Sequence, residues 1–162
     1  MSEKWSLEGQ KALVTGGSRG IGAATAATLL ERGATALIVA RGEEQIETAV
    51  SGWRDAGYDA HGLAADVTSG TDRDRICRWI REQWGRLDIL VNNVGINIRR
   101  KMVEYSREEY EAIHSTNTDS AFRMCSVTWT LLKQSEAGSV VNILSVAGLT
   151  HLRTGTPYAM SK

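Results

Sequence analysis

Hydrophobic residues along this chain alternate between short continuous runs and segments with helical spacing. The first run, residues 12–14, leads directly into a glycine-rich turn, and the second, residues 36–40, is apolar throughout. Continuous apolar runs of this length are typical of strands that are buried on both faces. The pattern predicts five strands, at residues 11–15, 36–40, 58–65, 87–91 and 139–144.

Segments with helical periodicity separate these strands. They predict helices over residues 20–31, 43–55, 71–84 and 107–133. In the first, Ile21, Ala24 and Ala27 recur at helical spacing, and Ser106 followed by Glu109 has the form of a capping box before the last. Strict alternation of strands and helices predicts an α/β fold with a doubly wound parallel sheet and right-handed crossovers.

Composition and charge limit the classes of partner. The 162 residues carry 19 Lys and Arg and 19 Asp and Glu, so no net charge favours nucleic acid or an anionic membrane surface. No apolar run has the length of a membrane span. Cys77 and Cys125 lie in helical patterns, and His61, His114 and His151 are scattered, so we expect reduced cysteines and no metal site. A soluble, cytoplasmic protein is expected.

The turn Thr15–Gly22 has glycines suited to binding a diphosphate. Gly16 allows a sharp turn out of the strand, Gly20 allows the backbone to approach a pyrophosphate, and Gly22 allows the helix to pack closely on the strand. Free N–H groups at the helix start would face the anion. The turn lacks the Gly-Lys-Ser/Thr ending of a P-loop, which disfavours an ATPase. Taken alone, it could also be a simple tight connection.

Polar residues gather at the ends of the other predicted strands, where parallel sheets bind ligands. These positions are Ala40–Arg41, Asp66, Asn92–Gly95 and Ser145. Tyr158 and Lys162 follow at i, i+4 spacing, which would place them on one face of a helix. A nearby ammonium lowers the pKa of a tyrosine toward the range of an acid–base catalyst. Alone, however, such a pair is usually a surface pair, and Ser145 is an ordinary residue to end a strand.

Taken together, these motifs resemble the classical short-chain dehydrogenases/reductases over the whole chain. The shared positions are Thr15-Gly16-x-x-x-Gly20-x-Gly22, Asp66, Asn92-Asn93-x-Gly95, Asn117, Ser145 and Tyr158-x-x-x-Lys162. Trp5-x-Leu7-Glu8-Gly9 and Leu131-Leu132-Lys133-x-Ser135 are similar to tropinone-reductase-like members. The resemblance implies one Rossmann-type NAD(P)-binding domain over residues 1–162, with five strands in the order 3-2-1-4-5.

The resemblance also implies hydride transfer between a nicotinamide and a carbonyl or secondary alcohol. Tyr158 would be the general acid or base, and Lys162 would lower its pKa and hold the nicotinamide ribose. Ser145 would polarise the substrate oxygen, and Asn117 would hold a water in a proton relay. Asn117 could instead be a helix-interior residue that bonds to backbone.

The implied cofactor-binding residues follow the predicted strand ends. They are Thr15, Gly16, Ser18, Arg19, Gly20, Ile21, Gly22, Arg41, Asp66, Val67, Asn93, Gly95, Tyr158 and Lys162. Asp66 would contact the adenine edge, or could be a turn former or the cap of the next helix. NAD enzymes usually place an acid after the second strand, whereas this chain has Arg41 there and Arg19 in the glycine turn. Guanidinium groups suit a 2′-phosphate, so we predict NADP(H), with NAD(H) as the alternative and solvated surface charges as the other interpretation.

The segment that follows the fourth strand, Arg99-Arg100-Lys101, is strongly basic. It could be a solvated cluster or the entrance of a substrate pocket, where Arg99 would favour a carboxylate. His151 and Leu152 are candidate pocket residues because they lie between Ser145 and Tyr158.

Members of the family are longer than this chain, so we expect a piece that lacks the C-terminal strands. The strand at 139–144 would then be an exposed apolar edge. The chain by itself would show little turnover, and the full-length protein would be a homodimer or homotetramer. A non-catalytic dinucleotide-binding module is the alternative.

Overall fold

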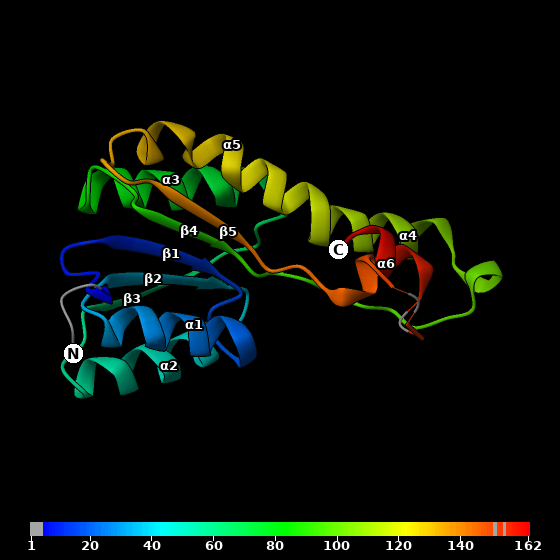
Figure 1. Cartoon of the computed structure of the whole chain (residues 1–162), viewed down its shortest axis with the longest axis horizontal. Coiled ribbons are helices and arrows are strands. Elements are labelled where there is room, and N and C mark those ends of the chain that lie inside the picture. The colour runs from blue at the N-terminus through cyan, green and yellow to red at the C-terminus, as the bar shows by residue number, and fades with distance from the viewer. Residues whose placement is uncertain (1–4, 151, 154) are drawn as a thin grey trace.

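Five parallel strands form a single sheet at the centre of the molecule (Figure 1). The computed structural model describes residues 5–150, 152–153 and 155–162. The strands are β1 (Lys11–Thr15), β2 (Thr35–Ala40), β3 (Ala60–Ala64), β4 (Ile89–Asn92) and β5 (Ser139–Asn142). Their order is β3-β2-β1-β4-β5, so the predicted fold class and strand order are confirmed.

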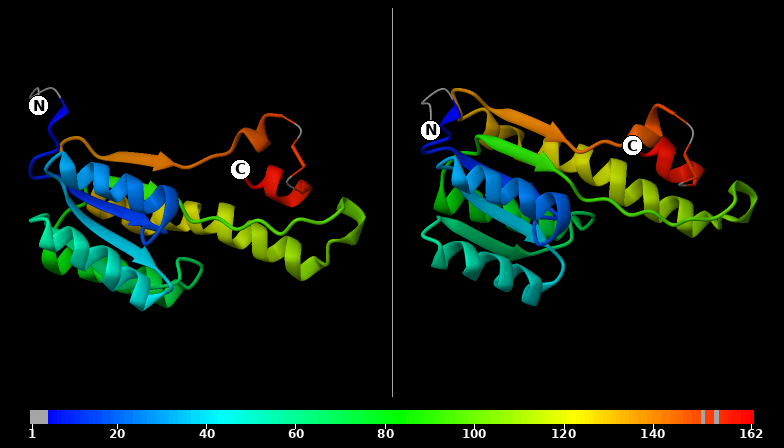
Figure 2. Two further views of the ribbon diagram at one scale, coloured as in Figure 1. Left: turned by 90° about the horizontal axis from the view of Figure 1, so that it is seen from below. Right: turned by 60° about the horizontal axis from the view of Figure 1, so that its bottom comes forward.

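Helices cover both faces of the sheet. They are α1 (Gly20–Glu31), α2 (Glu43–Asp55), α3 (Gly70–Gln83), α4 (Arg107–His114), α5 (Ser120–Leu132) and α6 (Thr156–Met160), with short 3₁₀ turns η2 (Met102–Glu104) and η4 (Val146–Gly148). Helices α1 and α2 lie on one face and α3 and α5 on the other, while α4 and α6 extend beyond the end of the sheet (Figures 1 and 2). No helix in this part of the chain is both long and apolar enough to cross a membrane.

The middle residues of β1, β2 and β4 are apolar because each face of the sheet meets its own layer of helices. Leu13 and Leu90 pack into the cluster under α3 and α5. Their neighbours Val14 and Val91 pack into the cluster under α1 and α2. Successive side chains of a strand point to opposite faces, so a strand covered on both sides needs an apolar residue at every position.

The predicted single helix over residues 107–133 is interrupted. Between α4 and α5 lies one turn of π-helix, η3 (Ser115–Asp119). The capping box that starts α4 is present, since Ser106 accepts from the Glu109 N–H and the Glu109 side chain accepts from the Ser106 N–H. Single π-turns inside helices occur often at functional sites. Hydrophobic spacing could not place this turn, which carries the buried Asn117.

Helix α1 has its predicted bounds, but its buried face differs from the stripe of residues whose spacing indicated the helix. Ile21 is 64% exposed and Ala24 is also exposed, whereas Gly22, Ala26 and Leu30 are buried. Gly22 packs closely on the turn that follows β1, and Ala26 and Leu30 lie on the same buried face of the helix.

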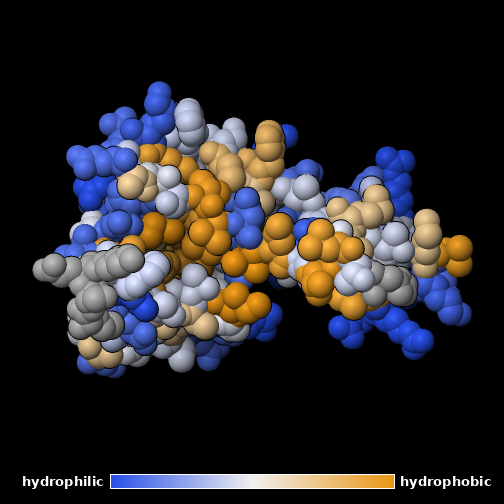
Figure 3. All heavy atoms as spheres, viewed as in Figure 1, coloured by the Kyte–Doolittle hydropathy of each residue, from blue (hydrophilic) through white to orange (hydrophobic). Residues whose placement is uncertain are grey.

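Strand β5 lies at the edge of the sheet, and all four of its residues are exposed. The predicted exposed apolar edge is therefore present, with Val140 and Val141 each 45% exposed. Figure 3 shows this hydrophobic band continuing onto the projecting part of the molecule, where Leu144 and Val146 are also exposed.

Candidate active site

The glycine turn between β1 and α1 has the conformation that its sequence predicts. Gly16 and Gly20 have φ of 66° and 58°, a region that residues with a Cβ rarely adopt. A Cβ on Gly22 would overlap the carbonyl oxygen of Gly16 and the side chain of Asn93. A Cβ on Gly20 would meet no atom within 4 Å, so this glycine faces open space. The turn therefore packs closely at Gly22, against Gly16 and Asn93, and leaves its backbone free at Gly20.

Thr15 and Asn93 hold the turn in place. The Asn93 side-chain amide donates to the carbonyl oxygens of Thr15 and Gly16, at 3.0 and 3.1 Å. The Thr15 hydroxyl accepts from the Asn93 N–H at 3.0 Å and donates to the Val91 carbonyl at 3.2 Å. Thr15 is only 2% exposed, so its predicted place in the cofactor site is a structural one that joins β1 to β4.

A cleft of about 780 Å³ opens in front of the turn, at the carboxyl ends of β1 to β4. The predicted residues that line it are Gly16, Ser18, Arg19, Gly20, Arg41, Asp66, Val67, Asn93 and Gly95. Its volume is within the range of small-molecule sites, and the N-terminus of α1 lies on its wall. The open space at Gly20 fits the phosphates of a dinucleotide.

Some predicted cofactor residues do not line this cleft, and some residues that line it were not predicted. Thr15, Ile21, Gly22, Tyr158 and Lys162 lie outside the lining. Gly42, Gln45, Thr68, Ser115 and Thr116 belong to it. Gln45 lies in the first turn of α2, close to Arg41 at the end of β2. Because ligands of parallel sheets bind at the strand ends, its position in the sequence could have indicated it. Ser115 and Thr116 lie in the π-turn and gave no sequence signal.

The two arginines of the cleft are exposed, and neither takes part in an ion pair within the described residues. Asp66 shows the turn-forming role that was the alternative to adenine binding. Its carboxylate accepts from the N–H and the hydroxyl of Thr68, at 2.9 and 2.7 Å. Asp66 also lines the cleft, so the turn presents its carboxylate there.

Asn117 is the centre of a buried network that joins three segments. Its side-chain oxygen accepts from the Ile96 N–H at 2.7 Å, and its amide donates to the Ile96 carbonyl at 2.9 Å. The amide also donates to the Ser161 hydroxyl at 2.8 Å. Asn117 thus bonds to backbone, as the alternative interpretation predicted, and ties the segment after β4 to the end of α6.

Lys162 lies beside the same network. Its ammonium donates to the Ile143 carbonyl at 3.0 Å, and a Cβ on Gly95 would lie 3.0 Å from Nζ and 3.5 Å from the oxygen of Asn117. Burial lowers the pKa of Lys162 from its ordinary value because the charged form loses solvation. Tyr158 lies in the short helix α6 (Thr156–Met160), and Lys162 follows that helix two residues after its last residue.

Among the residues that the structure describes, the side chains of Ser145 and Tyr158 are not bonded to this cluster, although the Tyr158 carbonyl accepts from the Ser161 hydroxyl at 2.8 Å. Ser145 caps η4, where its hydroxyl oxygen accepts from the Ala147 N–H at 3.2 Å. Tyr158 is half-buried in α6. Across the described part of the chain, no hydrogen bond joins the side chains of Ser145, Tyr158 and Lys162.

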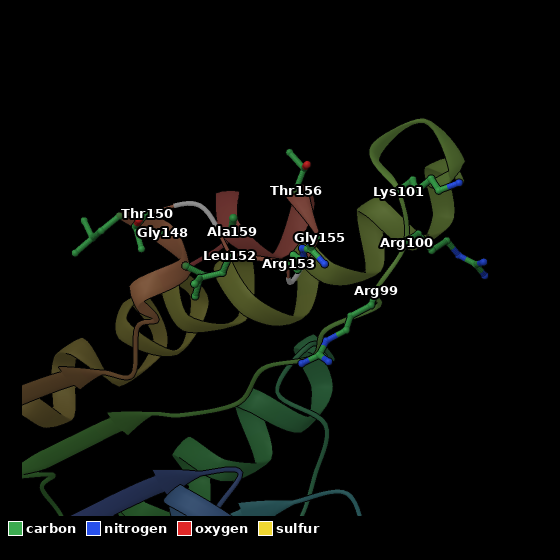
Figure 4. Close-up of a pocket in the computed structure, with 12 residues that line it drawn as sticks. Arg99, Arg100, Lys101, Gly148, Thr150, Leu152, Arg153, Gly155, Thr156 and Ala159 are labelled. Atoms are coloured by element: carbon green, nitrogen blue, oxygen red, sulfur yellow. The ribbon is translucent and has the colours of Figure 1, made fainter.

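A second pocket, of about 720 Å³, lies between the segment that follows β4 and the start of α6 (Figure 4). Its lining includes Arg99, Arg100, Lys101 and Arg153. Leu152 is on its wall, as predicted, whereas the other candidate pocket residue, His151, lies outside the described residues.

Known proteins share this sequence and fold. A tropinone reductase homolog of Arabidopsis thaliana is 42% identical over 161 residues, which cover 99% of this chain and 61% of that protein. A chloroplastic tropinone reductase homolog of the same plant is 41% identical over 161 residues and is covered to 50%. The chain thus spans about half to three fifths of the length of these relatives. Because one relative is chloroplastic, a cytoplasmic location stays a prediction.

Solved structures agree with the sequence relatives. A gluconate 5-dehydrogenase from Burkholderia cenocepacia, in complex with NADP and tartrate, superimposes with a TM-score of 0.90 at 32% identity, covering 98% of this chain and 62% of that one. The Pseudomonas aeruginosa RhlG/NADP active-site complex gives 0.92 at 35% identity, covering 99% and 64%. The profile of the short chain dehydrogenase family matches residues 10–162, and the chain therefore belongs to that family.

Proposed function

We propose that this chain carries the cofactor cleft and the acid–base residues of an NADP(H)-dependent oxidoreductase that interconverts a carbonyl and a secondary alcohol. The observation that carries the proposal is the cleft at the strand ends, with free backbone at Gly20 and two exposed arginines on its wall. The network of Asn117 and Lys162 at the neighbouring ends of β4 and β5 supports it. Relatives named as reductases and dehydrogenases support the class of reaction.

The proposed roles follow the chemistry of each side chain. The bound nicotinamide supplies or accepts the hydride at the substrate carbon. The Tyr158 hydroxyl gives its proton to the carbonyl oxygen in reduction and takes it back in oxidation. The Lys162 ammonium favours the tyrosinate that remains, and the Ser145 hydroxyl donates to the substrate oxygen. Asn117 holds the segment after β4 against the end of α6, which positions Lys162.

The preference for NADP(H) rests on the charges of the cleft. Arg19 and Arg41 both line it, and neither is neutralised by an ion pair in the described part of the chain. Asp66 is the one carboxylate among the described lining residues, and it bonds to Thr68 at the end of another strand. Two guanidinium groups can hold a 2′-phosphate through paired N–H donors. Both solved relatives above are named as NADP complexes, which supports the same choice.

Steady-state kinetics on the protein from its complete coding sequence test this function. We expect kcat/KM with NADPH to exceed that with NADH, and Arg41→Ala to reduce the ratio about tenfold or more because it removes a charge-assisted bond to phosphate. Equal or better use of NADH by the unaltered protein would refute the preference. Tyr158→Phe should abolish turnover while NADPH binding, followed by calorimetry, persists.

A non-catalytic dinucleotide-binding module is the second candidate. It is favoured by the lack of hydrogen bonds among the side chains of Ser145, Tyr158 and Lys162 in the described residues. The same assays separate the two functions. A module binds NADPH without oxidising it in the presence of any ketone, and Tyr158→Phe changes nothing that can be measured.

We further propose that the whole protein forms a homo-oligomer. Helix α5 exposes Phe122 and Trp129, at 66% and 60%, on its surface away from the sheet. Large exposed apolar side chains of this kind mark association surfaces. Light scattering would give the mass, and Trp129→Glu should shift it toward the monomer.

A further inference from the structure

The pocket beside Tyr158 is unusual for the charge of its walls. It is lined by Arg99, Arg100, Lys101 and Arg153, and none of its described lining residues is Asp or Glu. The remaining wall is built from small and aliphatic residues with two hydroxyls. They are Ala147, Gly148, Leu149, Thr150, Leu152, Gly155, Thr156 and Ala159. A site with cations on one side and apolar surface on the other is complementary to an aliphatic anion.

Two of the four cations have acidic partners outside the pocket. The Arg100 guanidinium bonds to the Glu109 carboxylate at 2.6 Å, and the Lys101 ammonium lies 3.4 Å from the Glu104 carboxylate. Figure 4 shows both side chains extending away from α6, while Arg99 extends back toward the sheet. Neither Arg99 nor Arg153 forms an ion pair among the described residues. The unneutralised charge of the pocket therefore comes from these two guanidinium groups.

The walls that carry Arg99 and Arg153 are held together. The Tyr105 hydroxyl donates to the Ile98 carbonyl and accepts from the Arg100 N–H, which fixes the segment around Arg99. Gly155, with φ of 98°, lies so close to Tyr105 that an added Cβ would overlap its hydroxyl. This contact sets the start of α6, just after Arg153, against the same tyrosine. Tyr105 thus joins the segment that carries Arg99 to the start of α6, which follows Arg153, and both arginines line the pocket between these two segments.

The pocket is next to the proposed chemistry. Its wall includes Ala147 and Gly148, which directly follow the Ser145 region, and Thr156 and Ala159, which flank Tyr158 on α6. The segment carrying Arg99 begins at Gly95 and Ile96, which line the cofactor cleft. A substrate that reaches from Tyr158 into this pocket would bring its distal end to the arginines.

We propose that the substrate is a carbonyl compound, or the matching alcohol, with a carboxylate or phosphate group that Arg99 and Arg153 bind. The claim that this compound is reduced or oxidised rests on the proposed function, whereas the claim that the two arginines bind its anionic group does not. A cationic amine ketone would be disfavoured by the same two charges. Guanidinium groups bind carboxylates and phosphates through paired N–H donors.

Matched pairs of ketones test the proposal on the protein from its complete coding sequence. Levulinate and methyl levulinate differ only in the carboxylate, and dihydroxyacetone phosphate and dihydroxyacetone differ only in the phosphate. We expect kcat/KM to favour at least one anion over its neutral partner by about tenfold or more, because charge-assisted bonds are strong. The arm with the larger ratio identifies the anionic group.

Two variants locate the effect. Arg99→Gln and Arg153→Gln should each reduce the ratio of anion to neutral ketone severalfold, chiefly through KM, and the double variant should bring it near unity. Arg107→Gln is the control, because Arg107 is an exposed arginine of α4 paired with Glu111 and lies outside the pocket lining. Its ratio should match that of the unaltered protein. Ratios near unity in the unaltered protein, or no response to the double variant, would overturn the proposal.

Calorimetry of the same ligands separates this inference from the proposed reaction. Tighter binding of an anion than of its neutral partner, lost in the double variant, supports the pocket even if neither ketone is reduced, and that combination would refute the oxidoreductase instead. Equal binding of anion and neutral partner would overturn the pocket proposal. Added salt should reduce the preference for the anion.

Discussion

Strands β4 and β5 pair along their whole length and both end in Val-Asn, yet they differ in exposure. Val91 is 1% exposed and its partner Val141 is 45% exposed, although both are valines in parallel strands. Strand β4 lies between β1 and β5, whereas β5 forms the edge of the sheet. Burial is thus decided by the neighbours of a strand and not by its residues.

The same difference runs through the candidate site. The glycine turn is anchored in the interior through Thr15 and Asn93. Ser145 and Tyr158 belong to short elements that follow the exposed edge, where Asn117 is the main buried tie. The nucleotide side of the site is therefore held by the core, and the catalytic side by a few polar contacts. Four experiments test this contrast.

Removal of matched side chains from β4 and β5 should have the largest effect. Leu90 of β4 and Val140 of β5 are paired side by side in the register of the two strands. Leu90 is fully buried, so Leu90→Ala should lower the free energy of unfolding by about 2–5 kcal/mol through lost burial and a cavity. In the 162-residue chain, Val140→Ala should cost below about 1 kcal/mol because that side chain is already half exposed there. Urea denaturation measures the free energy of unfolding of both variants. Equal losses of stability would contradict the contrast between the buried strand β4 and the edge strand β5.

Two glycines of the turn separate packing from phosphate binding. Gly22→Ala should reduce stability by about 1–3 kcal/mol, because its Cβ overlaps the backbone of Gly16. Gly20→Ala should cost about 1 kcal/mol for its positive φ and weaken NADPH binding strongly, since the methyl group enters the open space of the cleft. Thermal unfolding and calorimetric titration with NADPH distinguish the two. The prediction fails if Gly20→Ala binds NADPH normally.

Loss of the Asn117 side chain should destabilise α6 and the segment around Ile96 without affecting the strands that hold the glycine turn. Asn117→Ala leaves the Ile96 N–H and carbonyl without partners, at a cost of about 1–3 kcal/mol. Hydrogen exchange should accelerate in α6 and in the segment around Ile96, while the amides of β1 and β2 stay protected. Exposed Asp119→Asn in the same π-turn is the control. Uniform acceleration throughout the sheet would show that the two sides unfold together.

The smallest expected effect is a dependence of stability on acid pH from Asp88, at the base of β4. Burial raises the pKa of this carboxyl, but hydrogen bonds from Ser135, the Lys11 N–H and Arg86 outweigh it and hold the pKa below 3.8. The unfolded chain therefore binds the proton more readily, and the stability contributed by Asp88 is complete above about pH 4 and is lost as the pH falls through the folded pKa. Asp88→Asn should remove about 1 kcal/mol at neutral pH and flatten the acid decline.

Unfolding at a series of pH values measures this dependence. Asp74→Asn, on the exposed surface of α3, is the matched control and should keep the acid decline. An unchanged decline in Asp88→Asn would assign it to other carboxyls.

The sequence by itself determined the fold and the nucleotide side of the site. Apolar runs and helical spacing are local patterns, and a parallel sheet brings its strand ends to one edge, so Arg41, Asp66 and Asn93 could be placed together before any coordinates. Glycine spacing also predicted the turn, because positive φ and close packing each require the missing Cβ.

Only the tertiary structure decided the features that depend on contacts between distant segments. The π-turn that buries Asn117 and the face of α1 that packs on the sheet both follow from packing that no local pattern records. Arg153 gave no sequence signal because it is 54 residues from Arg99, and the two share a pocket through tertiary contacts such as that of Gly155 with Tyr105. Exposure of β5 likewise depends on which strands lie beside it, since Val141 is exposed while the paired Val91 of β4 is buried.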